Sequence, residues 1–333
     1  PYSHIHALGL ILSMEPAAIV QGGTHSITHA LLRAFERYGG EFFVLNEVNK
    51  VLVDNKKAYG IELTNGDKIL ADIVVSDLSI ELTMDKSGKD NWPAELWAKG
   101  QKLKDKPDDL YNTSAYERTQ LLWGNIALMD APKYPQNPEL GMVPRLYFGK
   151  ADPEYFLSGR YQKERWDLGI ANQMYLLVAP DVQWDPTRAP AGRFAALVEE
   201  FTCPWRQFSE KQWLKIKKDI EFRMVEEWGK YAPNVNMDNF ISAWIATPDD
   251  VVNRNPCMPQ GGWGALDANY ERLGRLRPFP EISGYRMPIK NYYLCSSAAH
   301  SAHGIGRGSS YACYKVIAQD LGLKYKPWEE RGW

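Results

Sequence analysis

Hydrophobic residues recur with helical spacing in the segment 25–37. Apolar side chains occupy positions 27, 30, 31, 34 and 35, which share one face of a helix. Gly22-Gly23-Thr24 offers a flexible entrance with a capping hydroxyl, and Gly39-Gly40 ends the pattern. The spacing therefore predicts an amphipathic helix over 25–37.

After residue 41, alternation of apolar and polar residues replaces the helical spacing. Apolar positions between 48 and 63 alternate with polar ones around a turn at Asp54-Asn55, and Asn65-Gly66 is a strong hairpin signal. The segment Ile69–Val75 then follows as another strand. We predict a β-meander over 41–76 whose final stretch, Ile73-Val74-Val75, is buried.

The middle of the chain is less regular. The segment 86–115 is polar and is predicted to contain loops and a short helix. Between 117 and 205, predicted strands such as 145–148 and 173–178 alternate with proline-rich connections.

A long helix is predicted after this region. Ser209 and Gln212 form a capping box, apolar residues follow with helical spacing, and Pro233 closes the pattern. The segment 247–290 is rich in glycine and proline and is expected to form long ordered loops.

The segment 291–322 combines a short strand, a glycine-punctuated turn and a helix. Glycines let a flat ligand approach the backbone, and a helix start offers free N–H groups and a positive dipole end. Such a turn suits an anionic or electron-accepting group. An ordinary strand-to-helix connection is the alternative that spacing alone leaves open.

Composition adds three constraints. A length of 333 residues suggests about two domains at roughly 150 residues each. The net charge of −2 argues against a nucleic-acid partner. The 12 Trp and 18 Tyr could line an apolar pocket or simply fill a core.

Cysteine, histidine and hydropathy patterns exclude other classes. The four cysteines form no CxxC pair, which favours free thiols over a zinc ribbon, although two periplasmic disulfides stay open. His25 and His29 have zinc-ligand spacing, but Ser26 stands where a zinc-protease helix needs Glu, so we expect no metal site. An apolar run of about 18 residues is absent, so no membrane span is expected.

The tail 291–311 resembles the carboxy-terminal flavin motif of the phytoene desaturase, carotenoid isomerase and retinol saturase group. These FAD-dependent oxidoreductases belong to the amine-oxidase-like flavoprotein superfamily. The segment 22–77 is similar to the group's glycine-pair, helix and meander unit. Thr247-Pro248 and Gly261-Gly262-Trp263-Gly264 are similar to its loop before the final strand.

The resemblance implies a mixed α/β fold (α+β in part). Part of a Rossmann-like FAD-binding domain would accompany a substrate domain of mixed sheet and helices. The implied boundaries are 1–18 for the end of a substrate-domain segment, 19–85 for the first FAD-domain part, 86–246 for the substrate domain, and 247–333 for the return to the FAD domain.

The resemblance also implies site residues. The catalytic candidates are His300 and His303, because imidazole titrates near neutral pH and can accept a proton; pocket-wall histidines are the alternative. The FAD-binding candidates are Glu47, Val48, Cys295, Ser296, Gly304, Ile305, Gly306, Arg307, Gly308 and Ser309.

Two departures from the group's pattern stand out. The strand–GxGxxG–helix unit that cradles the FAD pyrophosphate does not occur in these 333 residues. The chain therefore resembles roughly the latter two-thirds of such an enzyme, either as a truncated piece or as one subunit of a split enzyme similar to the two-chain limonene dehydrogenases. The second departure is His303, where relatives usually carry more glycine.

The implied function is FAD-dependent hydride removal from a hydrophobic isoprenoid or terpene-like substrate, by desaturation, dehydrogenation or hydroxylation with water. A second polypeptide would supply the glycine-rich half. A non-catalytic scaffold subunit and a redox-neutral isomerase are the alternatives. The expected location is the cytoplasm or a membrane periphery, with peripheral membrane contact as a further option and the periplasm left open.

Overall fold

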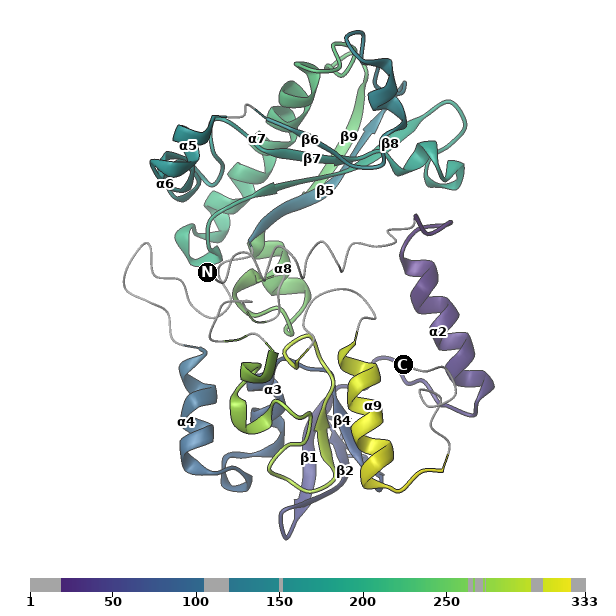
Figure 1. The fold of residues 1–333 in the computed structure, drawn as a ribbon, viewed down its shortest axis with the longest axis vertical. Helices are drawn as coiled ribbons and strands as arrows, with labels where there is room; N and C mark the ends of the chain where they lie inside the picture. The colour runs from purple at the N-terminus through teal and green to yellow at the C-terminus, as the bar shows by residue number, and fades with distance from the viewer. Residues whose placement is uncertain are drawn as a thin grey trace. The chain divides into compact units, whose positions relative to one another are not determined.

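The computed structural model describes residues 19–104, 120–149, 152–262, 266, 272, 274–300 and 308–324. The chain divides into two compact units, coloured by residue number in Figure 1. Unit 1 comprises residues 1–43 and 120–250, and unit 2 comprises residues 44–119 and 251–333.

Unit 1 is built on a five-stranded antiparallel sheet with strand order β6-β7-β8-β5-β9. The predicted strands 145–148 and 173–178 correspond to the two short strands at one edge. The strand bounds are β5 Leu121–Leu128, β6 Leu146–Phe148, β7 Leu176–Ala179, β8 Phe194–Phe201 and β9 Phe240–Ala246.

Helix α7 (Glu210–Gly229) lies along one face of this sheet (Figure 1). The predicted capping box is present, with the Ser209 N–H donating to Gln212 Oε1 at 2.9 Å. Trp213 and Trp228 are fully buried on the face of the helix that meets the sheet. The predicted helix is confirmed, and its apolar side forms the core of unit 1.

The shorter helices of the 120–254 region flank the sheet or follow it: α5 Pro153–Leu157, α6 Arg160–Leu168 and α8 Pro248–Arg254. Helix α2 (His25–Arg37) has the predicted bounds, but none of its residues is buried, and Leu31 is 64% exposed. Thr24 occupies the N-cap position without a side-chain hydrogen bond, so its expected capping role is wrong.

The meander of unit 2 has three antiparallel strands, β1 Val48–Asp54, β2 Lys57–Leu63 and β3 Lys68–Leu70. The predicted continuous strand Ile69–Val75 is wrong, because the chain leaves the meander after Ala71, whose N–H still donates to Tyr59 O. Its second half is β4 (Val74–Ser76), which pairs in parallel with β10 (Tyr292–Leu294). Val75 is 43% exposed rather than buried.

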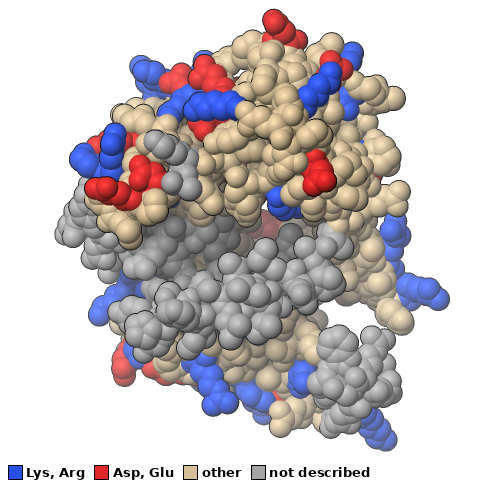
Figure 2. Space-filling view, turned by 45° about the horizontal axis from the view of Figure 1, so that its top comes forward, with Lys and Arg blue, Asp and Glu red and all other residues tan. Residues whose placement is uncertain are grey.

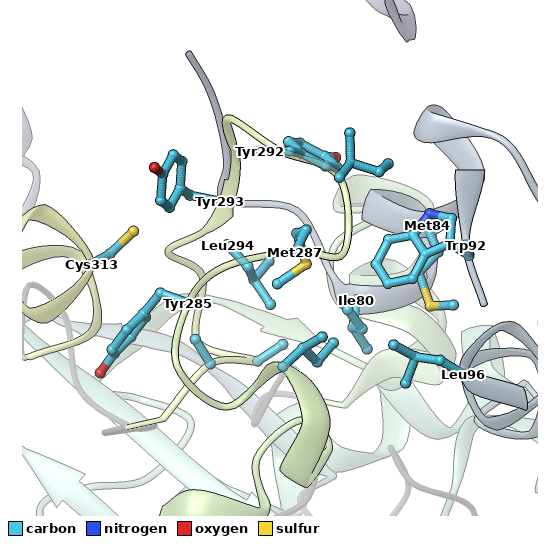
Figure 3. Packing of buried hydrophobic residues seen from close by; sticks show 14 of the residues in the cluster. Ile80, Met84, Trp92, Leu96, Tyr285, Met287, Tyr292, Tyr293, Leu294 and Cys313 are labelled. Atoms are coloured by element: carbon cyan, nitrogen blue, oxygen red, sulfur yellow. The ribbon is translucent and has the colours of Figure 1, made fainter. Parts of the chain in front are cut away.

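Helices α3 (Ile80–Ser87), α4 (Ala94–Lys102) and α9 (Ser309–Asp320) complete unit 2. Figure 3 shows Ile80, Met84, Trp92 and Leu96 in one buried cluster with residues from around β10. The shared cluster joins α4 to unit 2, whereas the sequence set a boundary at residue 86. The units change at residues 43/44, 119/120 and 250/251, so α2 groups with unit 1. The assignment of flavin and substrate roles to these parts stays a prediction.

The mixture of helices and sheets confirms the predicted fold class. Basic and acidic side chains are interspersed over the described atoms of the face in Figure 2. Within the described ranges, no helix is long and apolar enough to cross a membrane. The described residues also contain no cluster of three or more His, Cys, Asp or Glu side chains suited to a metal.

Candidate functional site

The carboxyl ends of β4 and β10 meet at one edge of unit 2. The Cys295 N–H donates to Ser76 O at 2.8 Å, which fixes the end of β10 beside the end of β4. Asp77 follows β4 directly. Ligands of α/β proteins bind outside the carboxyl ends of parallel strands, so this edge is a candidate site.

A cavity of about 520 Å³ opens beside β4. Its wall is mainly aliphatic and includes a few polar groups from Glu47, Ser76, Asp77 and Lys86. This volume falls in the usual range for small-molecule pockets. The lining residues are Glu47, Val48, Val51, Gly60, Ile61, Ile69, Ala71, Ile73, Val74, Val75, Ser76, Asp77, Leu78, Leu82, Lys86, Pro256 and Tyr292.

Glu47 and Val48, two of the predicted cofactor contacts, lie in this wall at the start of β1. Val48 pairs with Leu63, and Glu47 O accepts the Thr64 N–H at 2.9 Å, so the main chain is held by the meander. The Glu47 carboxylate lies 3.8 Å from Lys86 Nζ, with its side chain 75% exposed. The main chain of Glu47 and Val48 is therefore fixed, whereas the Glu47 carboxylate stays at the rim of the cavity.

The turn after β10 is fixed by local hydrogen bonds and by one buried cation. The N–H groups of Ala298 and Ala299 donate to Ser296 Oγ and Ser296 O, respectively. Arg277 is fully buried, and its Nε and an Nη donate to Ser297 O at 3.0 and 2.7 Å. A buried guanidinium bound in this way holds the turn in one conformation.

His300 ends this turn and is half-buried. Its Nδ1 is buried and has no hydrogen-bond partner among the residues that the structure describes. Buried polar atoms are almost always satisfied, so this ring nitrogen indicates a partner that the described residues do not supply.

Helix α9 begins next to the same turn. Gly308 has φ 81° at its N-cap, a conformation that favours glycine, and the Ser309 hydroxyl donates to Cys295 O at 3.0 Å. At this N-terminus the 12-residue helix presents free N–H groups and the positive end of its dipole.

Seven of the twelve predicted site residues lie in the described part of the chain, in two groups. Glu47 and Val48 line the cavity. Cys295, Ser296, His300, Gly308 and Ser309 belong to the turn after β10 and the start of α9, and this turn is linked to the cavity wall by the Cys295 N–H bond to Ser76 O. The predicted residues His303, Gly304, Ile305, Gly306 and Arg307 lie outside the described residues. The roles assigned to all of these residues stay predictions.

Sequence reasoning missed Asp77 and Arg277. Asp77 could have been found, because it directly follows a β-rich run and a parallel strand would place it at the ligand edge. Arg277 carries no such signal, since its partner Ser297 is 20 residues away in the sequence, beyond β10.

The described residues fit separate parts of FAD in their chemistry. The aliphatic cavity suits the flat adenine end of a dinucleotide, the α9 terminus suits negative charge, and His300 Nδ1 lacks a partner among the described residues.

The thiols at this edge are held in the protonated state. Burial raises the pKa of Cys295 to about 11, with a further contribution from the Asp77 charge. Burial also raises the pKa of Cys313 to about 12. Neither thiol is suited to nucleophilic chemistry at neutral pH, because the thiolate is the reactive form.

Alkylation by iodoacetamide tests these pKa values. At pH 8, Cys295 should react about a hundredfold more slowly in the folded protein than in urea, because the thiolate fraction falls tenfold per pKa unit. The folded-state rate should rise with pH through the region around 11. Peptide mass spectrometry follows each cysteine. Equal folded and unfolded rates at pH 8 would show that the thiol is not desolvated.

Comparison with known proteins identifies relatives of this chain. A scan against protein-family models found no match. "Pyridine nucleotide-disulfide oxidoreductase domain-containing protein 2" of Rattus norvegicus is 24% identical over 95% of this chain and 54% of its own length. A limonene dehydrogenase subunit of Castellaniella defragrans is 22% identical over 93% of this chain and 57% of its own length.

A neurosporene-forming phytoene desaturase of Cereibacter sphaeroides is 22% identical over 85% of this chain and 50% of its own length. A solved putrescine oxidase variant matches the fold with a TM-score of 0.52 at 12% identity, covering 90% of this chain and 53% of that one. The chain spans about half the length of the curated relatives that it matches. These likenesses agree with the motif in the tail: the chain is similar in sequence to phytoene desaturase-like oxidoreductases, and it shares its fold with the putrescine oxidase variant.

Proposed function

We propose that this chain forms part of an FAD-dependent dehydrogenase or desaturase that acts on a hydrophobic, terpene-like substrate. The observation that carries the proposal is the cavity at the carboxyl end of β4, where Ser76 of its wall accepts the Cys295 N–H at the start of the turn that ends at His300. The relatives named as a limonene dehydrogenase subunit and a phytoene desaturase support the substrate class.

The chain's own residues have three tasks in this proposal. The main chain at Glu47 and Val48 holds the adenosine end of FAD, and the α9 terminus at Gly308 and Ser309 stabilises negative charge at the flavin end. When bound, FAD supplies the hydride acceptor. His300 holds or accepts a proton at the same turn.

A second polypeptide supplies the glycine-rich phosphate-binding half. Among the described residues, β4 and β10 form a sheet of only two parallel strands, whereas parallel sheets are normally larger and buried on both faces. Further strands from the partner would extend this sheet. The complex would work in the cytoplasm or at a membrane periphery, where an apolar substrate is available.

The test is to purify the chain with its native associates and record a visible spectrum. The proposal expects flavin absorbance that co-elutes with this chain and a second polypeptide, and bleaching of the flavin band on addition of a terpene substrate. A colourless, stable monomer would contradict it. A flavin that a substrate never reduces would favour a scaffold or isomerase role, and flavin bound without a second polypeptide would contradict the split arrangement.

A further inference from the structure

One face of the unit 1 sheet carries aromatic side chains, and helix α7 packs on the opposite face, although its Lys217 Nζ lies 5.4 Å from the centroid of the Trp244 ring. Leu122 and Val198 are fully buried on the α7 side. Successive residues of a strand point to opposite faces, so Trp123 and Glu199 lie on the other face. We call this second face the aromatic face.

Four side chains form a row across the aromatic face. The register aligns Tyr147 with Leu177, Leu177 with Glu199, and Glu199 with Trp123. Directly opposed residues of antiparallel strands have Cβ atoms about 4.5–5.5 Å apart, so these side chains are neighbours. A carboxyl group therefore lies between a leucine and a tryptophan.

Two more rings extend this row. The Tyr175 ring centroid lies 5.8 Å from that of Tyr147, and the Trp244 ring meets Trp123 edge-on at 6.4 Å. Tyr147, Tyr175 and Trp244 are 58%, 40% and 43% exposed. Clustered exposed rings of this kind mark a binding surface rather than a core.

Among the residues that the structure describes, Arg145 is the charged side chain that acts on Glu199. Trp123 donates a side-chain hydrogen bond to it, and Arg145 acts on it through its charge while pairing with Asp181 at 2.8 Å. Both effects lower the pKa of Glu199, yet burial outweighs them and raises it. The pKa of Tyr147 is raised by burial and by Glu199, so this phenol stays neutral near pH 7.

We propose that the aromatic face binds an uncharged apolar ligand and that Glu199 takes up a proton when the ligand covers it. The charges favour this ligand class, because Arg145 and the Lys217 ammonium over Trp244 oppose a cation and an ionised Glu199 opposes an anion. The inference rests on the proposed function for the identity of the ligand as an isoprenoid-like hydrocarbon. The test of this inference needs neither flavin nor turnover, so the inference and the proposed function can fail separately.

The pH dependence follows from linkage. A ligand that removes water from the carboxyl disfavours its ionised form and raises its pKa further. Affinity is therefore highest when Glu199 is protonated and falls as the pH rises above the pKa of the free protein. Each unit by which the ligand raises that pKa corresponds to a tenfold change in affinity.

The experiment titrates the full chain with N-phenyl-1-naphthylamine, an uncharged fluorescent apolar probe, at pH values from 5 to 8. Wild-type affinity should fall about tenfold over this range if binding raises the pKa of Glu199 by one unit. Glu199→Gln should keep the low-pH affinity throughout. The matched control is Glu226→Gln, which changes an exposed residue of α7 and should retain the wild-type pH dependence.

A second pair of variants locates the probe. Tyr147→Ser should weaken binding at pH 5 about tenfold, since the ring supplies apolar contact area. Leu214→Ser, on an exposed part of α7, should leave binding unchanged. Tyr175→Ser replaces Tyr147→Ser if the latter does not fold, as judged by circular dichroism.

Three results would overturn the inference. Absence of probe binding, or binding that neither tyrosine substitution weakens, would remove the site. Wild-type binding that is independent of pH, or a Glu199→Gln variant that keeps the pH dependence, would remove the proton uptake by Glu199.

Discussion

Replacing Gly124 by Ala should destabilise unit 1 by about 3 kcal/mol, at the upper end of the usual cost of overpacking. Gly124 lies in β5, between β8 and β9, and pairs with Val198 and Ile245. A Cβ atom at this position would lie 1.8 Å from Trp244 O and 2.8 Å from Ile245 Cα. Both are backbone atoms that cannot rotate away, so β9 would have to separate from β5.

Urea unfolding measured by tryptophan fluorescence would quantify this loss. The control is Gly141→Ala in the same unit, where the nearest atom to a new Cβ is the flexible end of Gln183 at 3.9 Å. This surface change should alter the free energy of unfolding by less than about 0.5 kcal/mol. Equal effects of the two substitutions would mean that β5 and β9 do not approach so closely.

Replacing His300 by Ala should lower turnover about 10²- to 10⁴-fold, the usual contribution of a positioned acid or base. FAD content should fall much less, because the main-chain contacts around the cavity and the α9 terminus do not depend on the imidazole. Steady-state kinetics and the flavin-to-protein absorbance ratio measure the two quantities. Equal losses of turnover and flavin would indicate a packing role for the ring instead.

Two further substitutions distinguish the nitrogens of His300. Asn places a polar atom near the position of Nδ1, the buried nitrogen that lacks a partner among the described residues, whereas Gln extends toward the position of Nε2. Partial rescue by Asn alone would assign the function to Nδ1. His29→Ala on the exposed helix α2 is the control and should leave turnover unchanged.

The candidate site depends on interactions at very different sequence separations. The Ser296 turn and the start of α9 are formed by residues within about one helical turn of each other, so the tail motif predicts them. Arg277, by contrast, reaches Ser297 from a loop that the sequence described only as rich in glycine and proline. Its burial is a tertiary property, because an isolated arginine is almost never fully buried without partners.

Glu199 was also absent from the residues that the sequence singled out. The strand containing it alternates, but a glutamate at an alternating position reads as a solvent-facing residue. Only the register of β8 with β7 and β5 places Leu177 and Trp123 on either side of its carboxyl group. Cross-strand neighbours come from segments about 20 and 75 residues away, which no local pattern specifies.

The sequence by itself determined the elements whose signals are local. Helical spacing gave α2 and α7, Asn65-Gly66 gave the hairpin between β2 and β3, and the capping box gave the start of α7. The resemblance of the tail identified the family that the comparisons support. These features depend on neighbours within a few residues, where propensity and turn chemistry act directly.

Only the tertiary structure decided how distant segments combine. It separated β4 from the meander and paired Val74 with Tyr292, more than 200 residues later. This pairing creates the edge where Ser76 of the cavity wall bonds to Cys295 at the start of the His300 turn. It also ordered the five strands of unit 1, leaving one face aromatic. Long-range pairing is chosen by burial and hydrogen bonding that must repay the entropy of closing long loops, and those terms belong to the whole fold rather than to any segment.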